Sequence, residues 1–291
     1  MEGDRLADLL DRPVTEVTPV SGGSICAAYR VRLADGSQAF AKTSRDGSPP
    51  GFFAAEARGL GRLRAAHQHG GVGVPDLVAV ADDCLVLEWV EPGRPTVDTA
   101  EALGRSLTVT HRIGAETFGD PIGPSFIGSL PLPSGPYGSW AQLWAEGRVL
   151  PYVRAARDRG SLGRIDAADV ERALAGIAEL PGADEPPALV HGDLWSGNVL
   201  WTAGEAVLVD AAAVHGGHRE SDLAMLALFG LPYLDVMLAA YEAAADPPLA
   251  DGWRDRVGVH QLHPVLVHAV LFGGGYGAQA GRLARQAQRL R

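Results

Sequence analysis

The chain has 291 residues, of which 46% are hydrophobic and 21% charged, so it can bury a large core as one domain or as two lobes around a cleft. Its net charge of -10 argues against a nucleic-acid partner, because binding to a phosphate backbone needs a basic face. Two cysteines, Cys26 and Cys84, are too few for a disulfide framework and lack the paired spacing of a zinc site, so reduced thiols are expected.

The N-terminal residues 1–12 carry acids where a signal peptide would have a basic patch and an apolar segment. This favours a cytoplasmic protein. Residues 264–281 come nearest to a membrane span, but they contain His268 and several glycines and fall short of the roughly 20 apolar residues needed. We therefore expect a buried helix there and no membrane partner.

The first third of the chain has the pattern of short strands around one helix. Turn signals at residues 21–23 and 35–36 separate apolar runs, and apolar residues recur at helical spacing after residue 51. The expected elements are strands at 17–20, 28–33, 38–43, 77–80 and 84–90, with a helix at 51–66.

The remainder has mainly helical periodicity. A stretch rich in proline and glycine at 118–138 is expected to be mostly irregular, and residues 188–210 alternate apolar runs with polar loops, as short strands beside a site would. Helices are expected at 99–113, 140–157, 167–180 and beyond residue 219. The pattern predicts an α+β fold with two lobes, a small β-rich lobe at 1–91 and a larger, mainly helical lobe at 92–291.

Two residue types occur only once. Of 25 basic residues only Lys42 is lysine, and Asn198 is the only asparagine. A position that keeps a residue type avoided elsewhere suggests a need for its specific chemistry, although chance survival is the alternative for each taken alone.

The segment His191 to Asn198 reads HGDLWSGN, and Asp210 follows twelve residues later. Phosphoryl transfer requires a carboxylate to orient and deprotonate the attacking hydroxyl, and oxygen ligands for Mg²⁺. The five-residue step from Asp193 to Asn198 is that of the kinase catalytic loop. Asp193 is thus the candidate base, with Asn198 and Asp210 as metal ligands; an Asp-capped turn beside a satisfied Asn is the alternative.

Lys42 ends an apolar strand, at the place where kinases carry the lysine that binds the α- and β-phosphates of ATP. Glu56 on the following helix is its expected partner, because an ion pair would hold the ammonium in place and keep it charged. A surface lysine and a surface glutamate are the alternative. The turn with Gly22 and Gly23 is a weaker nucleotide signal, since it is not a complete glycine-rich loop.

Glu88, Trp89 and Val90 end a strand directly before Pro92-Gly93. This position suits a hinge whose backbone meets adenine, but an ordinary strand-to-loop transition fits equally well. The histidines at 191, 215 and 218 match no zinc spacing, and we expect His191 to be structural.

At these residues the chain resembles the fructosamine-3-kinase (ketosamine kinase) family, a relative of the aminoglycoside and choline kinases. The resemblance is carried by HGDLWSGN at 191–198, GHRESDLAM at 217–225, PGFFAAEA at 50–57 and LFGG at 271–274. It implies a protein-kinase-like fold, ATP and Mg²⁺ as cofactors, and the same roles for Asp193, Asn198, Asp210, Lys42 and Glu56. It also implies an insert at about 118–148, with Trp140 and Arg148, on the substrate side.

The substrate that the resemblance implies is a ketosamine, as a glycated amine or a glycated protein. Trp195 could form a wall of the sugar site, and His218, Arg219 and Glu220 follow a glycine-rich loop that could reach the same cleft; packing or helix capping is the alternative for each. Ala211-Ala212 departs from the family, which usually has Pro-Ala after the metal-binding Asp.

Three other functions are alternatives to a ketosamine kinase. A kinase for another small hydroxyl substrate, such as an aminoglycoside or an amino alcohol, is the second candidate. A nucleotide-binding pseudokinase has no support, because Lys42, Asp193, Asn198 and Asp210 are all present. A protein kinase is disfavoured, because Gly192 stands where the His-Arg-Asp motif has arginine.

Overall fold

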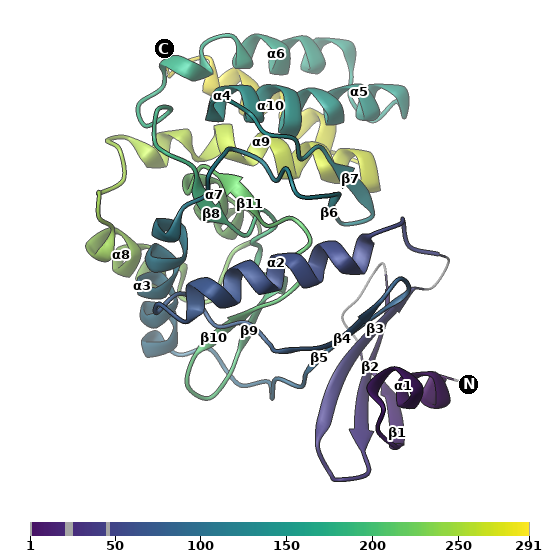
Figure 1. The fold of residues 1–291 in the computed structure, drawn as a ribbon. Helices are drawn as coiled ribbons and strands as arrows, with labels where there is room; N and C mark the ends of the chain where they lie inside the picture. The colour runs from purple at the N-terminus through teal and green to yellow at the C-terminus, as the bar shows by residue number, and fades with distance from the viewer. Residues whose placement is uncertain (1, 21–25, 45–46, 291) are drawn as a thin grey trace.

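The computed structural model describes residues 2–20, 26–44 and 47–290 (Figure 1). A sheet-rich N-terminal part is followed by a mainly helical C-terminal part, which confirms the predicted α+β class. The predicted lobe boundary near residue 92 lies between the last strand of the N-terminal sheet and the first C-terminal helix.

The N-terminal part is an antiparallel five-stranded sheet with the order β1-β2-β3-β5-β4. Helix α1 (Glu2–Leu10), which the sequence reading did not predict, buries Leu6 against one face of this sheet. The strands are β1 (Val14–Pro19), β2 (Cys26–Leu33), β3 (Gln38–Ser44), β4 (Leu77–Ala81) and β5 (Cys84–Glu88), and α2 (Phe52–His67) lies between β3 and β4 in the chain.

Strand β3 determines which side of the sheet the lysine faces. Side chains alternate between the two faces of a strand, and Ala39 and Ala41 belong to the small cluster under α1. Phe40 packs instead against the larger core that includes α2 residues. Lys42 therefore shares the face of Phe40 and points toward α2.

The C-terminal part begins with α3 (Val97–Ile113), whose first turn is closed by a capping box between Thr96 and Thr99. Three short antiparallel ribbons follow. The first of them lies within residues 118–138, the stretch that was predicted to be mostly irregular. They are β6 (Ser125–Ile127) with β7 (Leu130–Leu132), β8 (Ala188–Val190) with β11 (His215–Gly217), and β9 (Val199–Trp201) with β10 (Ala206–Leu208).

Several helices of the C-terminal part gather at the end of the molecule opposite the sheet (Figure 1). A second core, separate from the one around α2, lies among α5, α6, α9 and α10. The helices that follow α3 in the chain are α4 (Trp140–Gln142) with a π-helical turn (Leu143–Val149), α5 (Leu150–Asp158), α6 (Arg164–Leu174), α7 (Glu220–Phe229), α8 (Leu234–Ala244), α9 (Trp253–Phe272) and α10 (Tyr276–Ala287). Two 3₁₀ turns lie at Ile177–Glu179 and Ser196–Asn198.

Within the described residues, none of the helices has the length and apolar character needed to cross a membrane. The stretch 264–281 instead contains the end of α9 and the start of α10, separated by glycines 273–275.

Candidate active site

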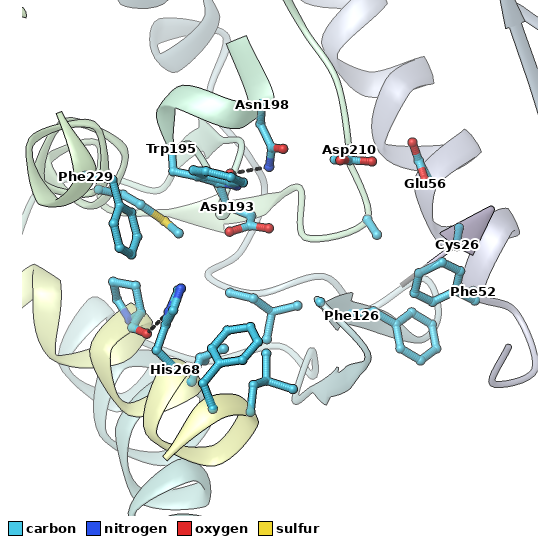
Figure 2. Close-up of a pocket in the computed structure, with 18 of the residues that line it drawn as sticks. Cys26, Phe52, Glu56, Phe126, Asp193, Trp195, Asn198, Asp210, Phe229 and His268 are labelled. Atoms are coloured by element: carbon cyan, nitrogen blue, oxygen red, sulfur yellow. Dashed lines mark hydrogen bonds between the residues drawn. The ribbon is translucent and has the colours of Figure 1, made fainter. Parts of the chain in front are cut away.

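One cavity of about 250 Å³ brings six of the predicted site residues together. Asp193 lies in the middle of it, with Asp210 and Glu56 on one side and Phe229 and His268 on the other (Figure 2). The remaining predicted residues on its wall are Lys42, Trp195 and Asn198. Elements from both parts of the chain thus line the cavity.

Lys42 and Glu56 form the predicted ion pair. The Lys42 Nζ lies 2.8 Å from Glu56 Oε1, and the Glu56 side chain is only 2% exposed. Lys42 also forms an ion pair with Asp210. Lys42 is thus the group that joins the carboxylates of Glu56 and Asp210 on this wall of the cavity.

Gly59 explains how α2 comes so close to the Asp210 loop. It lies one helical turn after Glu56, and a Cβ atom there would be 1.9 Å from the carbonyl oxygen of Ala211. Only a glycine permits this approach of two backbones. The distance between the Glu56 side of the site and Asp210 thus depends on a residue that carries no functional group.

The side chain of Asn198 closes the loop that carries Asp193. Asn198 Nδ2 donates a hydrogen bond to the backbone oxygen of Asp193 at 2.8 Å, which leaves its Oδ1 free to accept or to bind a cation. Burial raises the pKa of the Asp193 carboxyl above the ordinary 3.8. Asp193 therefore holds a proton more strongly than an exposed aspartate does.

His191 connects this loop to the residue before Asp210. Its Nδ1 accepts the backbone N–H of Asp193 at 3.3 Å, so Nε2 carries the proton that it donates to the carbonyl of Val209 at 2.9 Å. The two carboxylates, Asp193 and Asp210, are in this way fixed relative to each other by one buried ring.

Asp222 on α7 was not singled out from the sequence, although it is part of the GHRESDLAM segment. Its carboxylate accepts the backbone N–H groups of His191 at 2.8 Å and Gly192 at 3.0 Å. Behind it, His111 Nε2 is 3.2 Å from the same carboxylate and His111 Nδ1 is 2.7 Å from the Tyr241 hydroxyl. Burial acts to raise the pKa of Asp222, but the hydrogen bond and charge of His111 outweigh it and lower the pKa.

Some predicted residues are not on the wall of this cavity. Gly22 and Gly23 lie outside the described residues. Glu88 ends β5, and Trp89 stacks under Arg30, whose guanidinium carbon is 4.7 Å from the ring centroid. Neither they nor Val90 line the cavity. Trp195 does line it and is 39% exposed.

His218, Arg219 and Glu220 lie away from the cavity and are buried at the start of α7. Arg219 makes two hydrogen bonds to Glu185, of 2.7 and 2.8 Å, and Glu220 accepts two from Arg256, of 3.1 and 2.6 Å. Burial lowers the pKa of His218 to about 3. Burial acts to raise the pKa of Glu220, but hydrogen bonds and charges from His260 and Arg256 lower it to about 2.

His218, Glu220 and His260 also lie close enough together to suggest a metal site. Both His218 nitrogens are already engaged, because Nδ1 accepts the Glu220 backbone N–H and Nε2 donates to the Gly182 carbonyl. The cluster is therefore a hydrogen-bonded core. Arg148, from the implied insert, is likewise buried and donates to the carbonyl of Pro133 at 2.7 Å.

The sequence reading missed the opposite wall of the cavity. Phe229 ends α7, and His268 and Phe272 lie on the last turns of α9. Phe272 belongs to the LFGG segment at 271–274 that carried the family resemblance, but no role at the cleft was assigned to it, and Phe229 and His268 lie on helices that otherwise read as buried. Which of their faces meets Asp193 depends on how α7 and α9 pack.

The overall architecture has close counterparts among solved structures. A Thermobifida fusca protein named "putative fructosamine-3-kinase" superposes with a TM-score of 0.91 at 45% identity, covering 99% of this chain and 98% of that one. A macrolide 2'-phosphotransferase of Brachybacterium faecium superposes with a TM-score of 0.64 at 16% identity over 97% of each chain, which supports the fold alone. The fold and the site define a kinase-like phosphotransferase.

The sequence comparisons narrow this class. The family model described as fructosamine kinase matches residues 4–289. A probable ketoamine kinase of Synechocystis is 34% identical over 283 residues, which are 95% of this chain and 92% of that protein. The chain belongs to the fructosamine kinase family, as its motifs predicted.

Proposed function

We propose that this protein is an ATP-dependent kinase that phosphorylates a sugar hydroxyl of ketosamines, at carbon 3. The observation that carries the proposal is the arrangement of Asp193, Asn198 and Asp210 in one cavity with the Lys42–Glu56 pair. The family and the names of the relatives support a ketosamine as the acceptor.

Asp193 is the proposed base. The sugar hydroxyl donates its proton to the Asp193 carboxylate while its oxygen bonds to the γ-phosphorus of ATP, and the bond from that phosphorus to the bridging oxygen breaks to release ADP. The raised pKa of Asp193 suits it for accepting this proton. Trp195, two residues further on, borders the sugar.

The other side of the cavity is assigned to the nucleotide. Lys42 binds the α- and β-phosphates and is oriented by Glu56; its present pair with Asp210 shows that both groups reach the same space. Gly22 and Gly23 are assigned to the phosphate-binding turn, and Glu88, Trp89 and Val90 to the adenine-binding hinge between lobes 1–91 and 92–291.

The residues that line the cavity also fit Mg²⁺. This cation prefers hard oxygen ligands, and the Asp210 carboxylate and the free Oδ1 of Asn198 both line the cavity. When bound, the ion would neutralise charge on the phosphates. His218, Arg219 and Glu220 are assigned a positioning role, because they fix the start of α7, the helix that carries Asp222.

The decisive experiment is product analysis. The protein is incubated with Mg·ATP and a fructosamine, a ribulosamine, the corresponding aldoses, a 3-deoxy ketosamine and an aminoglycoside. We expect phosphorus coupled to the proton on carbon 3 in the NMR spectrum of the ketosamine product, and no turnover of the 3-deoxy analogue. Phosphate on another carbon, or a similar kcat/KM on the aminoglycoside, would reject the ketosamine assignment.

A further inference from the structure

Exposed aromatic side chains concentrate at the mouth of the cavity. Among the described residues, four aromatic side chains are prominently exposed, and Trp195, Phe229 and Phe272 of these line the cavity, with exposures of 39%, 40% and 63%. Apolar side chains grouped on a surface are a mark of binding sites. The remaining one, Tyr233, is not on the cavity wall.

These rings form a continuous wall leading away from Asp193. The centroids of Trp195 and Phe229 are 5.9 Å apart with the planes at 72°, those of Phe229 and His268 are 5.0 Å apart, and those of His268 and Phe272 are 5.4 Å apart. Figure 2 shows Phe229 and His268 on the side of Asp193 remote from Asp210 and Glu56. The wall is therefore on the side opposite the nucleotide-binding groups.

The chemistry of a ketosamine places its amine toward this wall. With the carbon 3 hydroxyl at Asp193, the amine on carbon 1 is two carbons away, and its substituent extends further outward. A secondary amine of this kind is cationic at neutral pH, and ring faces attract cations. Phe272 is the last residue of α9, and the C-terminal end of a helix also favours a positive charge.

His268 adds a polar group suited to the amine. Its Nδ1 lies 2.7 Å from the carbonyl of Pro264, which can only accept, so Nδ1 is the donor in this bond. In the neutral ring, Nε2 then carries the lone pair. It can accept an N–H of the amine without bringing a negative charge to the wall.

The charge of the cavity excludes one type of substituent. Lys42 is its only lysine or arginine in the part of the chain that is described, and it is already paired with Glu56 and Asp210. A carboxylate on the amine substituent would lie against aromatic rings at the C-terminal end of α9, which disfavours a negative charge, and Lys42 is on the other side of Asp193 with its own partners. A carboxylate moved out of water without a partner costs free energy.

We propose that Phe229 and Phe272 form a subsite for the amine substituent of the ketosamine, and that this subsite selects apolar substituents over those that carry a carboxylate. The proposal rests on the proposed function and adds the part of the substrate that is not the sugar. It implies that glycated alkyl or aryl amines are better substrates than glycated α-amino acids.

The test uses three fructosamines that share one sugar and differ only in the amine substituent: methyl, hexyl and carboxymethyl. A single methylene in a hydrophobic pocket discriminates by about 10-fold or more; because this rim is open to solvent, we expect the hexyl compound to exceed the methyl compound by about fivefold in kcat/KM. The carboxymethyl compound should fall below the methyl compound.

The variants locate the effect. Phe229→Ala and Phe272→Ala should each lower the ratio of hexyl to methyl kcat/KM, whereas Phe272→Leu should keep most of it. Ile165→Ala, which removes a 77% exposed apolar side chain on α6 away from the cavity, is the matched control and should leave the ratio unchanged.

Two results would overturn the subsite while the kinase function stands: equal kcat/KM for the hexyl and carboxymethyl compounds, or a ratio that neither phenylalanine variant changes. Failure to phosphorylate any of the three compounds would instead reject the proposed function together with the subsite.

Discussion

Asp222 Oδ2 accepts the backbone N–H of His191 at 2.8 Å, two residues before Asp193. Because Asp222 Oδ1 also accepts the N–H of Gly192, helix α7 holds the backbone that leads into Asp193, the proposed base. Gly192 has a φ of 79°, a conformation that glycine adopts without strain. The direction of the Asp193 side chain thus depends on a carboxylate that touches neither substrate.

Asp222→Asn should separate this positioning role from simple stabilisation. The amide can accept only at one oxygen and presents an N–H to a backbone donor, so one buried N–H loses its partner. We expect kcat to fall by about tenfold or more, with a nearly unchanged KM for ATP. Assays are made well below the measured Tm of the variant. A variant with wild-type kcat but a lower Tm would show that Asp222 contributes to stability and does not position Asp193.

Asp193→Asn should lower turnover by about 10²-fold or more, as expected for loss of a positioned base, and leave ATP binding nearly intact. In the wild type, the acid limb of kcat/KM should lie above pH 3.8, because burial raises the pKa of the carboxylate that must accept the proton. Assays stopped at fixed times measure the turnover of the variant, and the same assays across a range of pH locate the acid limb of the wild type. Retention of more than about a tenth of the turnover would contradict the assignment.

Much of the polar half of the site was predictable, because its residues are close in sequence or lie on regular elements. Asp193 and Asn198 share one loop, and the alternation in β3 fixes the face of Lys42. Glu56 could be proposed as its partner because it is on the next helix. These are local or nearly local relationships, which spacing and residue type encode.

The rest depends on packing between distant segments. His111 and Tyr241 reach Asp222 from α3 and α8, and no periodicity in either helix indicates that contact. His218, Arg219 and Glu220 were expected near the cleft because their loop could reach it, yet their partners are Glu185, Gly182 and Arg256, from separate parts of the chain. The aromatic wall could not be predicted for the same reason, because the sequence pattern of α9 indicates a helix that is buried on all sides.

Asp210→Ala should abolish Mg²⁺-dependent nucleotide binding and activity, because the cation would lose one of few protein oxygen ligands. The same change also removes one of the two carboxylates that pair with Lys42, so that its ion pair with Glu56 is kept and its ion pair with Asp210 is lost. Calorimetric titration with ATP, with and without Mg²⁺, distinguishes the two effects. Unchanged Mg·ATP affinity would remove Asp210 from the metal site.

The buried histidines predict a loss of stability in acid. Burial lowers the pKa of His263 and His218 from 6.5 to about 3, so between these values the unfolded chain binds protons that the folded protein does not. The contribution of these two histidines to the free energy of unfolding should therefore fall as the pH drops below 6.5 and stop changing near 3, by up to about 1.4 kcal/mol per pH unit for each group.

His263→Asn tests this directly. His263 Nδ1 donates to the carbonyl of Arg148 at 2.8 Å, and an asparagine amide can supply the same donor without titrating. We expect urea unfolding at several pH values to give a shallower acid slope for the variant than for the wild type. Parallel slopes would mean that His263 does not take part in the acid loss.

Lys42→Arg is the sharpest test of the polar side of the site, because this chain uses arginine for its other 24 basic residues and only this position keeps lysine. The ammonium fits between Glu56 and Asp210 as a compact point charge. A guanidinium is planar, larger and donates in a fixed fork, so it cannot contact Glu56 and the phosphates with the same geometry.

The variant should lose at least about tenfold in kcat/KM for ATP, while the fold is retained because the Lys42 side chain is still 13% exposed and a positive charge remains beside the buried Glu56. Glu56→Gln is the matched variant: it leaves the lysine but removes the group that orients it, and it should raise KM for ATP in the same direction. Steady-state kinetics with circular dichroism as a control for folding measure both. Wild-type kinetics in Lys42→Arg would show that the single lysine is an accident of composition, because every role assigned to it requires an ammonium group in this position.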